Sequence, residues 1–390
     1  MVHLLSNLLV GLTLAPSALG ATLLVSHFSG PVYTLSLTTS GTTGKLSIAS
    51  QASGCGTTPA WLEYYNDTKT AYCFDESWTG SGVITQYSVG SDGRLTQSGQ
   101  TRTSGNTVHG KLYGGSDGKG FIATAQYSPS TITTYKLPLG QGQVQLEKFT
   151  MSQRGPNSRQ DVPHPHETQL DSTGKFMLVP DLGADLIRIF KIDASTGRLT
   201  SCPAGQASPG DGPRHAKWWK SADGVLRLYT LNELGNSVSS WNVVYPTDSN
   251  GCLALSRAQT LSTYAPGKKG GPTTKAAEIR VAGNFLYASN RADQTFGSNQ
   301  DSIAIYTIDP QTGAIAWKEA ANSYSYYPRT FEINKDGTLV AFGGQTSSNV
   351  AIVSRDPATG KLGNLVANLQ VGNKGRAGEE DGLSAVVWVE

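Results

Sequence analysis

Histidine, arginine and glutamate stand at matching places in the middle and late parts of this 390-residue sequence. Two histidines and a glutamate fall within residues 163–167, and an arginine and a histidine within 212–215; further polar pairs occur at 232–233, 290–291 and 329–330. Arginine binds carboxylates through a planar, permanently charged fork. A histidine or glutamate whose pKa lies near neutrality can give or take a proton. Together these residue types indicate a site for a small anionic substrate whose reaction needs a proton transfer.

Recurring glycine turns predict the elements that position these residues. In one turn a glycine precedes Leu or Ile by two residues, and it recurs at Gly44, Gly93, Gly197, Gly313 and Gly360. These glycines are 49, 104, 116 and 47 residues apart, which corresponds to one or two copies of a unit of about 50 residues. The runs between the turns are rich in β-branched and aromatic residues, and several alternate between apolar and polar side chains, as half-buried strands do.

A β repeat of this length is typical of a propeller, whose blades bury their faces against one another around a central channel. We predict an all-β, seven-bladed β-propeller that occupies residues 21–390 as one domain, with three or four strands in each unit. The last strand, near 384–389, is expected to complete the same blade as an N-terminal strand near 23–25, because this closure removes an open edge. The polar residues described above would then lie at blade entries and strand ends, where the channel is lined.

The charge balance gives no sign of a nucleic-acid or membrane partner. The chain carries 31 basic and 29 acidic side chains, with no block of like charge. Beyond the N-terminus no run of about 18 apolar residues occurs, so no transmembrane helix is predicted. The sequence leaves the oligomeric state open.

The first 20 residues predict a secretory signal peptide. An apolar run leads to a small-x-small cleavage site at residues 18–20. The alternative is a buried first strand. If the signal peptide is correct, the mature protein is secreted and extracellular.

Four cysteines fit the oxidising compartment that secretion implies. Cys55, Cys73, Cys202 and Cys252 allow three pairings, of which pairing by proximity joins the first two and the last two. A sequon at Asn66 would make the chain a glycoprotein if it is secreted.

Several polar strings, in order and at blade spacing, resemble the seven-bladed lactonase family. That family includes bacterial-type 6-phosphogluconolactonases and fungal 3-carboxy-cis,cis-muconate lactonising enzymes, also called carboxymuconate cyclases. The strings that carry the resemblance are His166 with Asp171-Ser172-Thr173-Gly174-Lys175-Phe176 and Val179-Pro180-Asp181-Leu182-Gly183, then Gly212-Pro213-Arg214-His215, Asn232-Glu233-Leu234, Ser289-Asn290-Arg291 and Arg355-Asp356-Pro357-Ala358-Thr359-Gly360. The match covers about residues 160–365, whereas the first 140 residues follow only the rhythm of the repeat, and Gln126 stands where the family usually has Asn.

The resemblance implies a site in the central channel made of one histidine, one glutamate and two arginines. Carried over to this chain, the catalytic residues are His166, Glu233, Arg214 and Arg291. Substrate contacts are expected from His164, Asp181, Asn290 and Arg329. The partner would be a small carboxylate or lactone, and the resemblance implies no metal and no other cofactor.

Two reactions could use such a site. In lactone closure a carboxylate oxygen adds to a carbon–carbon double bond and the neighbouring carbon takes a proton, which a histidine or glutamate could supply. In lactone hydrolysis the base activates water and the arginines stabilise the oxyanion that develops.

Simpler interpretations of the same residues remain open. Arg214 and Arg291 could bridge blades by pairing with Asp181 or Glu233. His164 and His166 would share one face of an extended strand and could form a metal pair with a nearby carboxylate.

His215 follows Arg214 directly and should therefore point away from it on a regular strand. We interpret it as supporting the site or the fold.

At the level of function, the alternative to an enzyme is a secreted propeller that binds a partner or serves as a surface protein without catalysis. Fold alone does not separate the two. The presence of all four quartet residues favours the enzyme. Secretion would separate the protein from carboxymuconate and phosphogluconate, which are intracellular, so it predicts a different substrate.

Overall fold

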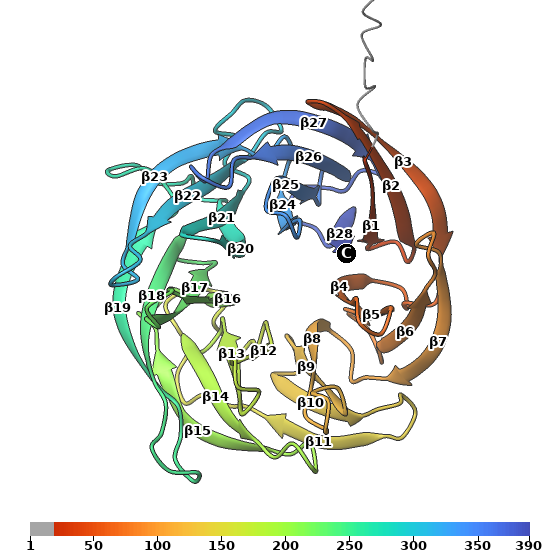
Figure 1. Ribbon diagram of the computed structural model, residues 1–390. Coiled ribbons are helices and arrows are strands. Elements are labelled where there is room, and N and C mark those ends of the chain that lie inside the picture. The colour runs from red at the N-terminus through yellow and green to blue at the C-terminus, as the bar shows by residue number, and fades with distance from the viewer. Residues whose placement is uncertain (1–18) are drawn as a thin grey trace, which may run out of the picture.

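Twenty-eight strands form seven four-stranded antiparallel sheets that surround a central channel (Figure 1). The structure is a computed structural model, and it describes residues 19–390. The seven sheets are the blades of a β-propeller, as the repeat predicts. Residues 19–390 contain no helix, and therefore none that could cross a membrane.

Each blade contributes one strand to each of four rings around the channel (Figure 1). The innermost strands are β28 (Leu383–Val389), β4 (Pro59–Tyr65), β8 (Thr107–Tyr113), β12 (Gln169–Leu170), β16 (Pro213–Lys220), β20 (Lys275–Ala282) and β24 (Pro328–Ile333). The second strands are β1 (Leu19–His27), β5 (Thr70–Asp75), β9 (Phe121–Gln126), β13 (Phe176–Asp181), β17 (Leu226–Asn232), β21 (Phe285–Arg291) and β25 (Leu339–Gly344). The third strands are β2 (Val32–Ser40), β6 (Val83–Val89), β10 (Thr131–Lys136), β14 (Leu186–Ile192), β18 (Ser237–Val244), β22 (Ser302–Ile308) and β26 (Asn349–Arg355). The outer strands are β3 (Thr43–Ala52), β7 (Leu95–Arg102), β11 (Gln143–Lys148), β15 (Leu199–Gln206), β19 (Ala254–Ser262), β23 (Ile315–Asn322) and β27 (Leu362–Gln370).

The ring closes by combining the two ends of the chain in one blade. Blade 1 has the strand order β28-β1-β2-β3, and blades 2 to 7 follow in sequence from β4. Leu24 in β1 pairs with Val387 in β28, which confirms the predicted closure. In Figure 1 the C-terminal strand lies on the channel side of the N-terminal strands. No blade is therefore left with an unpaired seam to its neighbour.

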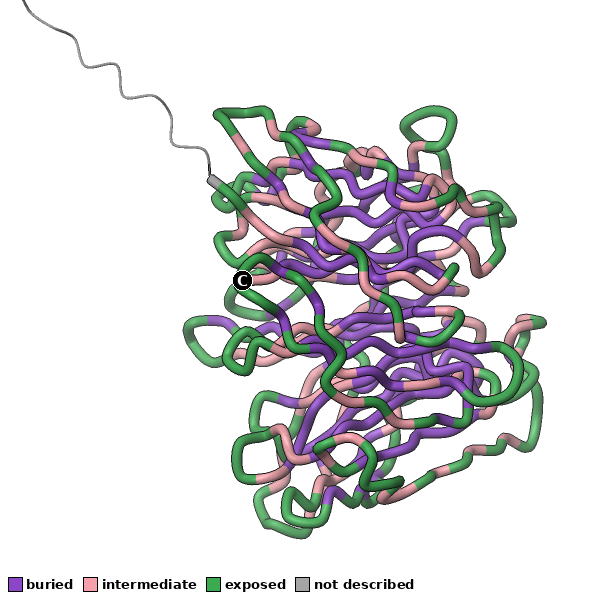
Figure 2. The backbone as a smooth tube through the Cα atoms, turned by 90° about the vertical axis from the view of Figure 1, so that its right-hand side faces the viewer, coloured by how far each residue is buried: buried purple, intermediate pink, exposed green. Residues whose placement is uncertain are grey.

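The hydrophobic core is divided among the junctions between blades. Each of the seven junctions holds one cluster of buried apolar side chains. Leu23 and Val25 face blade 7, whereas Leu24, between them, faces blade 2. Alternate residues of a strand point to opposite faces, so a run of apolar residues serves two junctions at once. Buried chain accordingly runs through the blades in Figure 2, and exposed chain lies mostly in the turns.

The recurring glycine turn connects the two outer strands of a blade and touches the preceding blade. Gly360 has a φ of 70°, and a Cβ placed there would lie 2.3 Å from the ring of Phe285. Its carbonyl accepts a hydrogen bond of 2.7 Å from the hydroxyl of Tyr287. Tyr113 donates to the carbonyl of Gly197 in the same way. Four of the five recurring glycines, all except Gly44, have a positive φ, so these turns need glycine both for that conformation and for the close approach of the neighbouring blade.

Both disulfides follow the pairing by proximity. Cys55 is bonded to Cys73 with a Cα–Cα distance of 5.8 Å, and Cys202 to Cys252 with 5.7 Å. The first ties the entry of blade 2 to β5, and the second ties blade 4 to blade 5.

Secretion and glycosylation stay predictions. Residues 1–18, which make up most of the predicted signal peptide, lie outside the described residues. Asn66 is exposed in the turn between β4 and β5, where a glycan could be attached.

Candidate active site at the upper mouth of the channel

The predicted site residues gather at one end of the channel, which we call the upper mouth. The innermost strands begin there and the second strands end there, because the two run antiparallel. Arg214 lies near the start of β16 and Arg329 near the start of β24, whereas Glu233 directly follows β17 and Arg291 ends β21. Positions far apart in sequence therefore meet because they hold equivalent places in different blades.

Glu233 is the centre of this group and contacts three arginines. Its Oε2 lies 2.9 Å from Arg214 Nε, and its Oε1 lies 2.9 Å from Arg291 Nη2. Arg159 also pairs with Oε1. Burial alone would raise the pKa of this carboxyl, but the three arginines together hold it well below its ordinary value. Glu233 is therefore a permanent carboxylate and a weak base.

His166 lies beside this cluster with a ring nitrogen free. The side chain is buried, and its Nδ1 has no hydrogen-bond partner among the described residues. Burial and, next, the charge of Arg214 hold the pKa of His166 well below 6.5. The imidazole is therefore neutral at neutral pH and can accept a proton.

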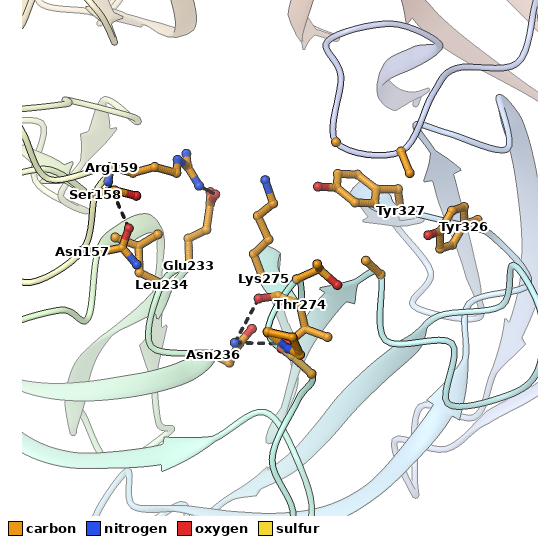
Figure 3. Close-up of a pocket in the computed structure, with 16 residues that line it drawn as sticks. Asn157, Ser158, Arg159, Glu233, Leu234, Asn236, Thr274, Lys275, Tyr326 and Tyr327 are labelled. Atoms are coloured by element: carbon orange, nitrogen blue, oxygen red, sulfur yellow. Dashed lines mark hydrogen bonds and ion pairs between the residues drawn. The ribbon is translucent and has the colours of Figure 1, made fainter.

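Two cavities meet at the upper mouth. An inner cavity of about 50 Å³ is lined by Glu76, Trp78, Tyr127, Arg159, His166, Glu233, Lys275, Arg291, Arg329 and Glu380. A wider cavity of about 720 Å³ shares Arg159, Glu233 and Lys275 with it. Figure 3 shows Arg159 and Glu233 directed toward each other, with Lys275 rising between them and Tyr327. The wider cavity is large enough for a small-molecule ligand.

The structure brings the predicted catalytic quartet together. His166, Glu233 and Arg291 line the inner cavity, and Arg214 contacts Glu233 from the wall behind it. Arg329, predicted to bind substrate, also lines the inner cavity. Arg291 in blade 6 does bridge two blades, as the simpler interpretation expects, because it pairs with Glu233 in blade 5. Arg214 pairs with Glu233 within blade 5 and reaches blade 6 through a hydrogen bond of 2.6 Å to the carbonyl of Ala277.

The other three predicted substrate contacts do not line either cavity. His164 stacks on Tyr127 at 4.0 Å between ring centroids. Asp181 accepts a hydrogen bond of 2.7 Å from the backbone N–H of His164 and pairs with Arg188 at 2.8 Å. Asn290 donates to the hydroxyl of Ser302 at 3.0 Å. These polar side chains hold neighbouring strands and turns together.

The metal-pair interpretation finds no geometry to support it in the described part of the chain. Both ring nitrogens of His164 are engaged, with the carbonyl of Tyr127 at 3.0 Å and with Asp161 at 3.0 Å. No group of three or more His, Cys, Asp or Glu side chains within residues 19–390 is arranged to hold a metal ion.

His215 does not point away from Arg214, so that prediction was wrong. Its Nε2 lies 3.2 Å from Arg214 Nη1, and both side chains are buried in the channel. The pairing of β16 with β17 shifts register between Pro213 and His215. This bulge adds one residue to the strand, and a bulge breaks the alternation on which the prediction rested.

Four charged residues of the inner cavity were not predicted from the sequence: Glu76, Lys275, Arg159 and Glu380, the last of which lies between β27 and β28. Glu76 follows β5 as Glu233 follows β17, so its equivalent place in blade 2 was a signal in the sequence. Lys275 begins β20, again at a blade entry. Arg159 lies in the long connection between β11 and β12, which has no counterpart in the repeat. No periodic signal could have found Arg159.

Comparison with known proteins agrees with this architecture. The family model described as a lactonase, 7-bladed beta-propeller, matches residues 22–378. A protein of Arthroderma benhamiae named "Probable 6-phosphogluconolactonase" is 34% identical over 310 residues, which are 78% of this chain and 75% of that protein. A 6-phosphogluconolactonase of Formosa agariphila is 30% identical over 258 residues, covering 64% of this chain and 68% of the relative.

Solved structures show the same fold. The periplasmic gluconolactonase of Pseudomonas aeruginosa superimposes with a TM-score of 0.77 at 23% identity, covering 95% of this chain and 99% of that one. A structure from Bacteroides fragilis described as a putative 6-phosphogluconolactonase gives a TM-score of 0.74 at 24% identity over 97% of this chain and 99% of its own. The chain belongs to the lactonase family of seven-bladed β-propellers.

Proposed function

We propose that this protein is a lactone hydrolase that binds an anionic lactone at the upper mouth of the channel. The observation that carries the proposal is a neutral, buried His166 with a free Nδ1 beside a glutamate held by three arginines. The curated relatives reported above are named as lactonases, which supports the same reaction class.

Excess positive charge supports an anionic substrate. The inner cavity is lined by four cationic side chains, Arg159, Lys275, Arg291 and Arg329, against three glutamates, and Arg214 adds a fifth cation behind Glu233. Guanidinium groups bind carboxylate or phosphate oxygens in a fork geometry. A negative group on the substrate would balance this excess.

His166 is the candidate base. In hydrolysis a water molecule attacks the lactone carbonyl carbon while the free imidazole nitrogen takes a proton from that water. Glu233 is poorly suited to this task because both of its carboxylate oxygens are paired with arginines, whereas Nδ1 of His166 has no partner among the described residues. Its role is to fix the arginines in place.

The arginines can stabilise the oxyanion that forms on the carbonyl oxygen. The Nε–H of Arg291 has no hydrogen-bond partner among the described residues although it is buried. A fixed donor that is already desolvated needs little reorganisation when negative charge develops. This arrangement favours hydrolysis through a tetrahedral intermediate.

The lactone-closing reaction is the second candidate. The same cations could bind a muconate-like carboxylate while an acid delivers a proton to carbon. Hydrolysis stands first because the relatives are named for it.

We also propose that the protein acts outside the cell, on the ground of its N-terminal sequence and its two disulfides.

A substrate screen tests the proposed function. Sugar lactones, carboxylate-bearing lactones and muconates would be offered to the disulfide-bonded protein, with a pH-stat to follow acid release and absorbance to follow muconates. We expect hydrolysis of at least one anionic lactone, and its loss in His166→Ala with the fold retained by circular dichroism. Absence of turnover with well-folded protein would contradict the proposal, and binding of the same compounds by calorimetry would then identify a non-catalytic binding protein.

A further inference from the structure

We infer that Glu76 is a second catalytic residue of this site, the acid that protonates the ring oxygen of the lactone as it departs. The inference rests on the proposed lactone hydrolysis and deepens it. No motif in the first 140 residues suggested such a role, and the assignment comes from where the structure places this side chain.

Glu76 and Glu233 come from opposite walls of the channel. Glu76 follows β5 in blade 2 and Glu233 follows β17 in blade 5, and both carboxyl groups line the inner cavity together with His166. Glu76 is 3% exposed, so bulk water reaches it little. Its backbone is fixed on both sides, since its N–H donates to the carbonyl of Thr58 at 2.9 Å and its carbonyl accepts from Asn106 at 3.2 Å.

The two glutamates have opposite electrostatic surroundings. Three arginines pair with Glu233: Arg159, Arg214 and Arg291. Glu76 shares one: Arg329 contacts Glu76 Oε2 through Nη2 at 3.2 Å and Glu380 Oε2 through Nη1 at 3.3 Å. The side chain of Glu76 is buried, whereas that of Glu380 is 31% exposed. Two carboxyls therefore share one guanidinium, and one negative charge has no partner in this group unless one carboxyl keeps its proton.

The proton belongs to Glu76 because it is the more buried of the two. The charged groups that act on it are Glu380 and Asp75, which oppose its ionisation, and Arg329 and Arg214, which favour it. Burial, followed by Glu380, raises the pKa of Glu76 to about 8. The pKa of Glu76 is thus raised while that of Glu233 is lowered. Two carboxyls of one site whose pKa values differ in this way are a common basis for assigning the acid in a hydrolytic site.

The chemical step balances with these groups alone. Water adds its oxygen to the carbonyl carbon and gives one proton to His166. The tetrahedral intermediate then collapses, the bond from carbon to the ring oxygen breaks, and the ring oxygen takes the proton of Glu76 to become a hydroxyl. His166 returns its proton to Glu76 through solvent, and the hydroxy acid product ionises. An alcohol is a poor leaving group without protonation, so this proton transfer is needed most when the ring oxygen is aliphatic.

The leaving group provides the test. Glu76→Gln would be compared with wild type on an aliphatic lactone, which releases an alcohol, and on an aromatic lactone, which releases a phenol. Loss of an acid should lower kcat for the aliphatic lactone by about 10²–10⁴-fold, and for the aromatic one by less than about tenfold, because a phenolate departs unaided. Glu63→Gln, at the opposite end of the channel, is the matched control and should leave both rates unchanged.

The pH dependence of kcat/KM separates an acid from a residue that only supports the fold, because a purely structural Glu76 would not change the shape of the pH profile when it is replaced. Two groups of the inner cavity lose a proton near pH 8: Glu76, and Lys275, whose pKa burial lowers to about 8. Wild-type kcat/KM should fall on the alkaline side as both titrate, and Glu76→Gln should keep only the part that belongs to Lys275. Glu380→Gln removes the like charge and should move the part that belongs to Glu76 to lower pH. Infrared spectra of the unliganded protein at neutral pH should show the carbonyl stretch of a protonated carboxyl that is lost in Glu76→Gln.

The outcomes separate the two proposals. Turnover by wild type with equal losses on both lactones, or with no loss at all in Glu76→Gln, would overturn the donor role and leave the hydrolase standing. No turnover by wild type on any lactone overturns the hydrolase and the donor role together, while the infrared arm still shows whether Glu76 holds a proton.

Discussion

The two mouths of the channel carry similar numbers of charges but arrange them differently. At the lower mouth, where the innermost strands end, a cavity of about 470 Å³ is lined by four acidic residues, Glu63, Glu167, Glu332 and Glu390, and four basic ones, Lys111, Lys217, Arg280 and Lys335. Lys111 lies 2.6 Å from Glu63, and Lys217 lies 2.8 Å from Glu167. At the upper mouth the cations outnumber the acids and several of them share partners.

Matched pairs at the lower mouth join blades. Glu63 and Lys111 link blade 2 to blade 3, and Lys217 in blade 5 pairs with Glu167, which precedes β12 of blade 4. Arg280 in blade 6 pairs with Glu278 of its own strand and with Glu332 in blade 7 at 3.6 Å. Such pairs need no ligand to complete them. Charge density in a propeller channel therefore does not by itself mark a site. The upper mouth differs in that its cationic side chains outnumber its acidic ones, whereas the two are equal in number at the lower mouth.

The largest effect is expected from breaking a matched pair at the lower mouth. Glu167 is fully buried and accepts hydrogen bonds from the backbone of Ala216 and from Lys217. Glu167→Ala should destabilise the protein by about 3–5 kcal/mol, because it leaves buried donors and a charge unpaired. Urea unfolding measures the loss. Replacing both partners, Glu167→Leu with Lys217→Met, should recover much of it, and a single variant as stable as wild type would show that the pairing does not hold the blades.

Removing one arginine from the upper mouth should lower the activity strongly and the stability only slightly. Glu233 keeps two cationic partners in Arg291→Ala, so unfolding free energy should change by no more than about 1 kcal/mol. Activity should fall by about 10²–10³ in kcat, as for the loss of one oxyanion donor. Arg291→Lys, which keeps the charge but not the fork, should lie in between. A large loss of stability with unchanged activity per folded molecule would make Arg291 a structural bridge.

Sequence reasoning reached the fold more fully than the site, and particular residues show why. The turn at Gly360 and the alternation around Leu24 are local patterns, so blade number, strand positions and closure could be predicted. Polar residues at strand ends were ambiguous, because such a side chain can face the channel, as Arg329 does, or bind a neighbouring turn, as Asp181 does. The spacing of residues does not distinguish these two directions.

Irregular features account for the remaining differences. The bulge at the start of β16 turned His215 toward Arg214, and nothing in the residue order announces a bulge there. Arg159 reaches Glu233 from a connection outside the repeat. Contacts of this kind depend on how the long loops close over the channel.

The upper-mouth glutamates should also differ in how they couple stability to pH. Glu76 has an ordinary pKa of 4.5 in the unfolded chain and about 8 in the folded protein. The folded state therefore keeps a proton that the unfolded chain has released, and the contribution of Glu76 to stability falls as pH rises between about 4.5 and 8. The difference in unfolding free energy between wild type and Glu76→Gln should decrease across this window.

Glu233→Gln is the matched control for that experiment. The pKa of Glu233 is lower in the folded state than in the unfolded chain, so its contribution is lost only as pH falls below about 4.5. Between pH 5 and 8 the difference from wild type should stay flat. A flat difference for Glu76→Gln as well would mean that Glu76 is ionised in the folded protein at neutral pH.

The smallest effect is expected at the rim of the lower mouth. Lys111 pairs with Glu63 at 2.6 Å, but its side chain is 30% exposed and remains partly solvated. Lys111→Met should therefore cost about 1 kcal/mol or less in unfolding free energy and leave kcat/KM unchanged. Thermal unfolding and the lactone assay would measure the two. If this substitution lowered activity as Arg291→Ala is expected to, the lower mouth would belong to the catalytic site, and the distinction between a matched and an unmatched mouth would be wrong.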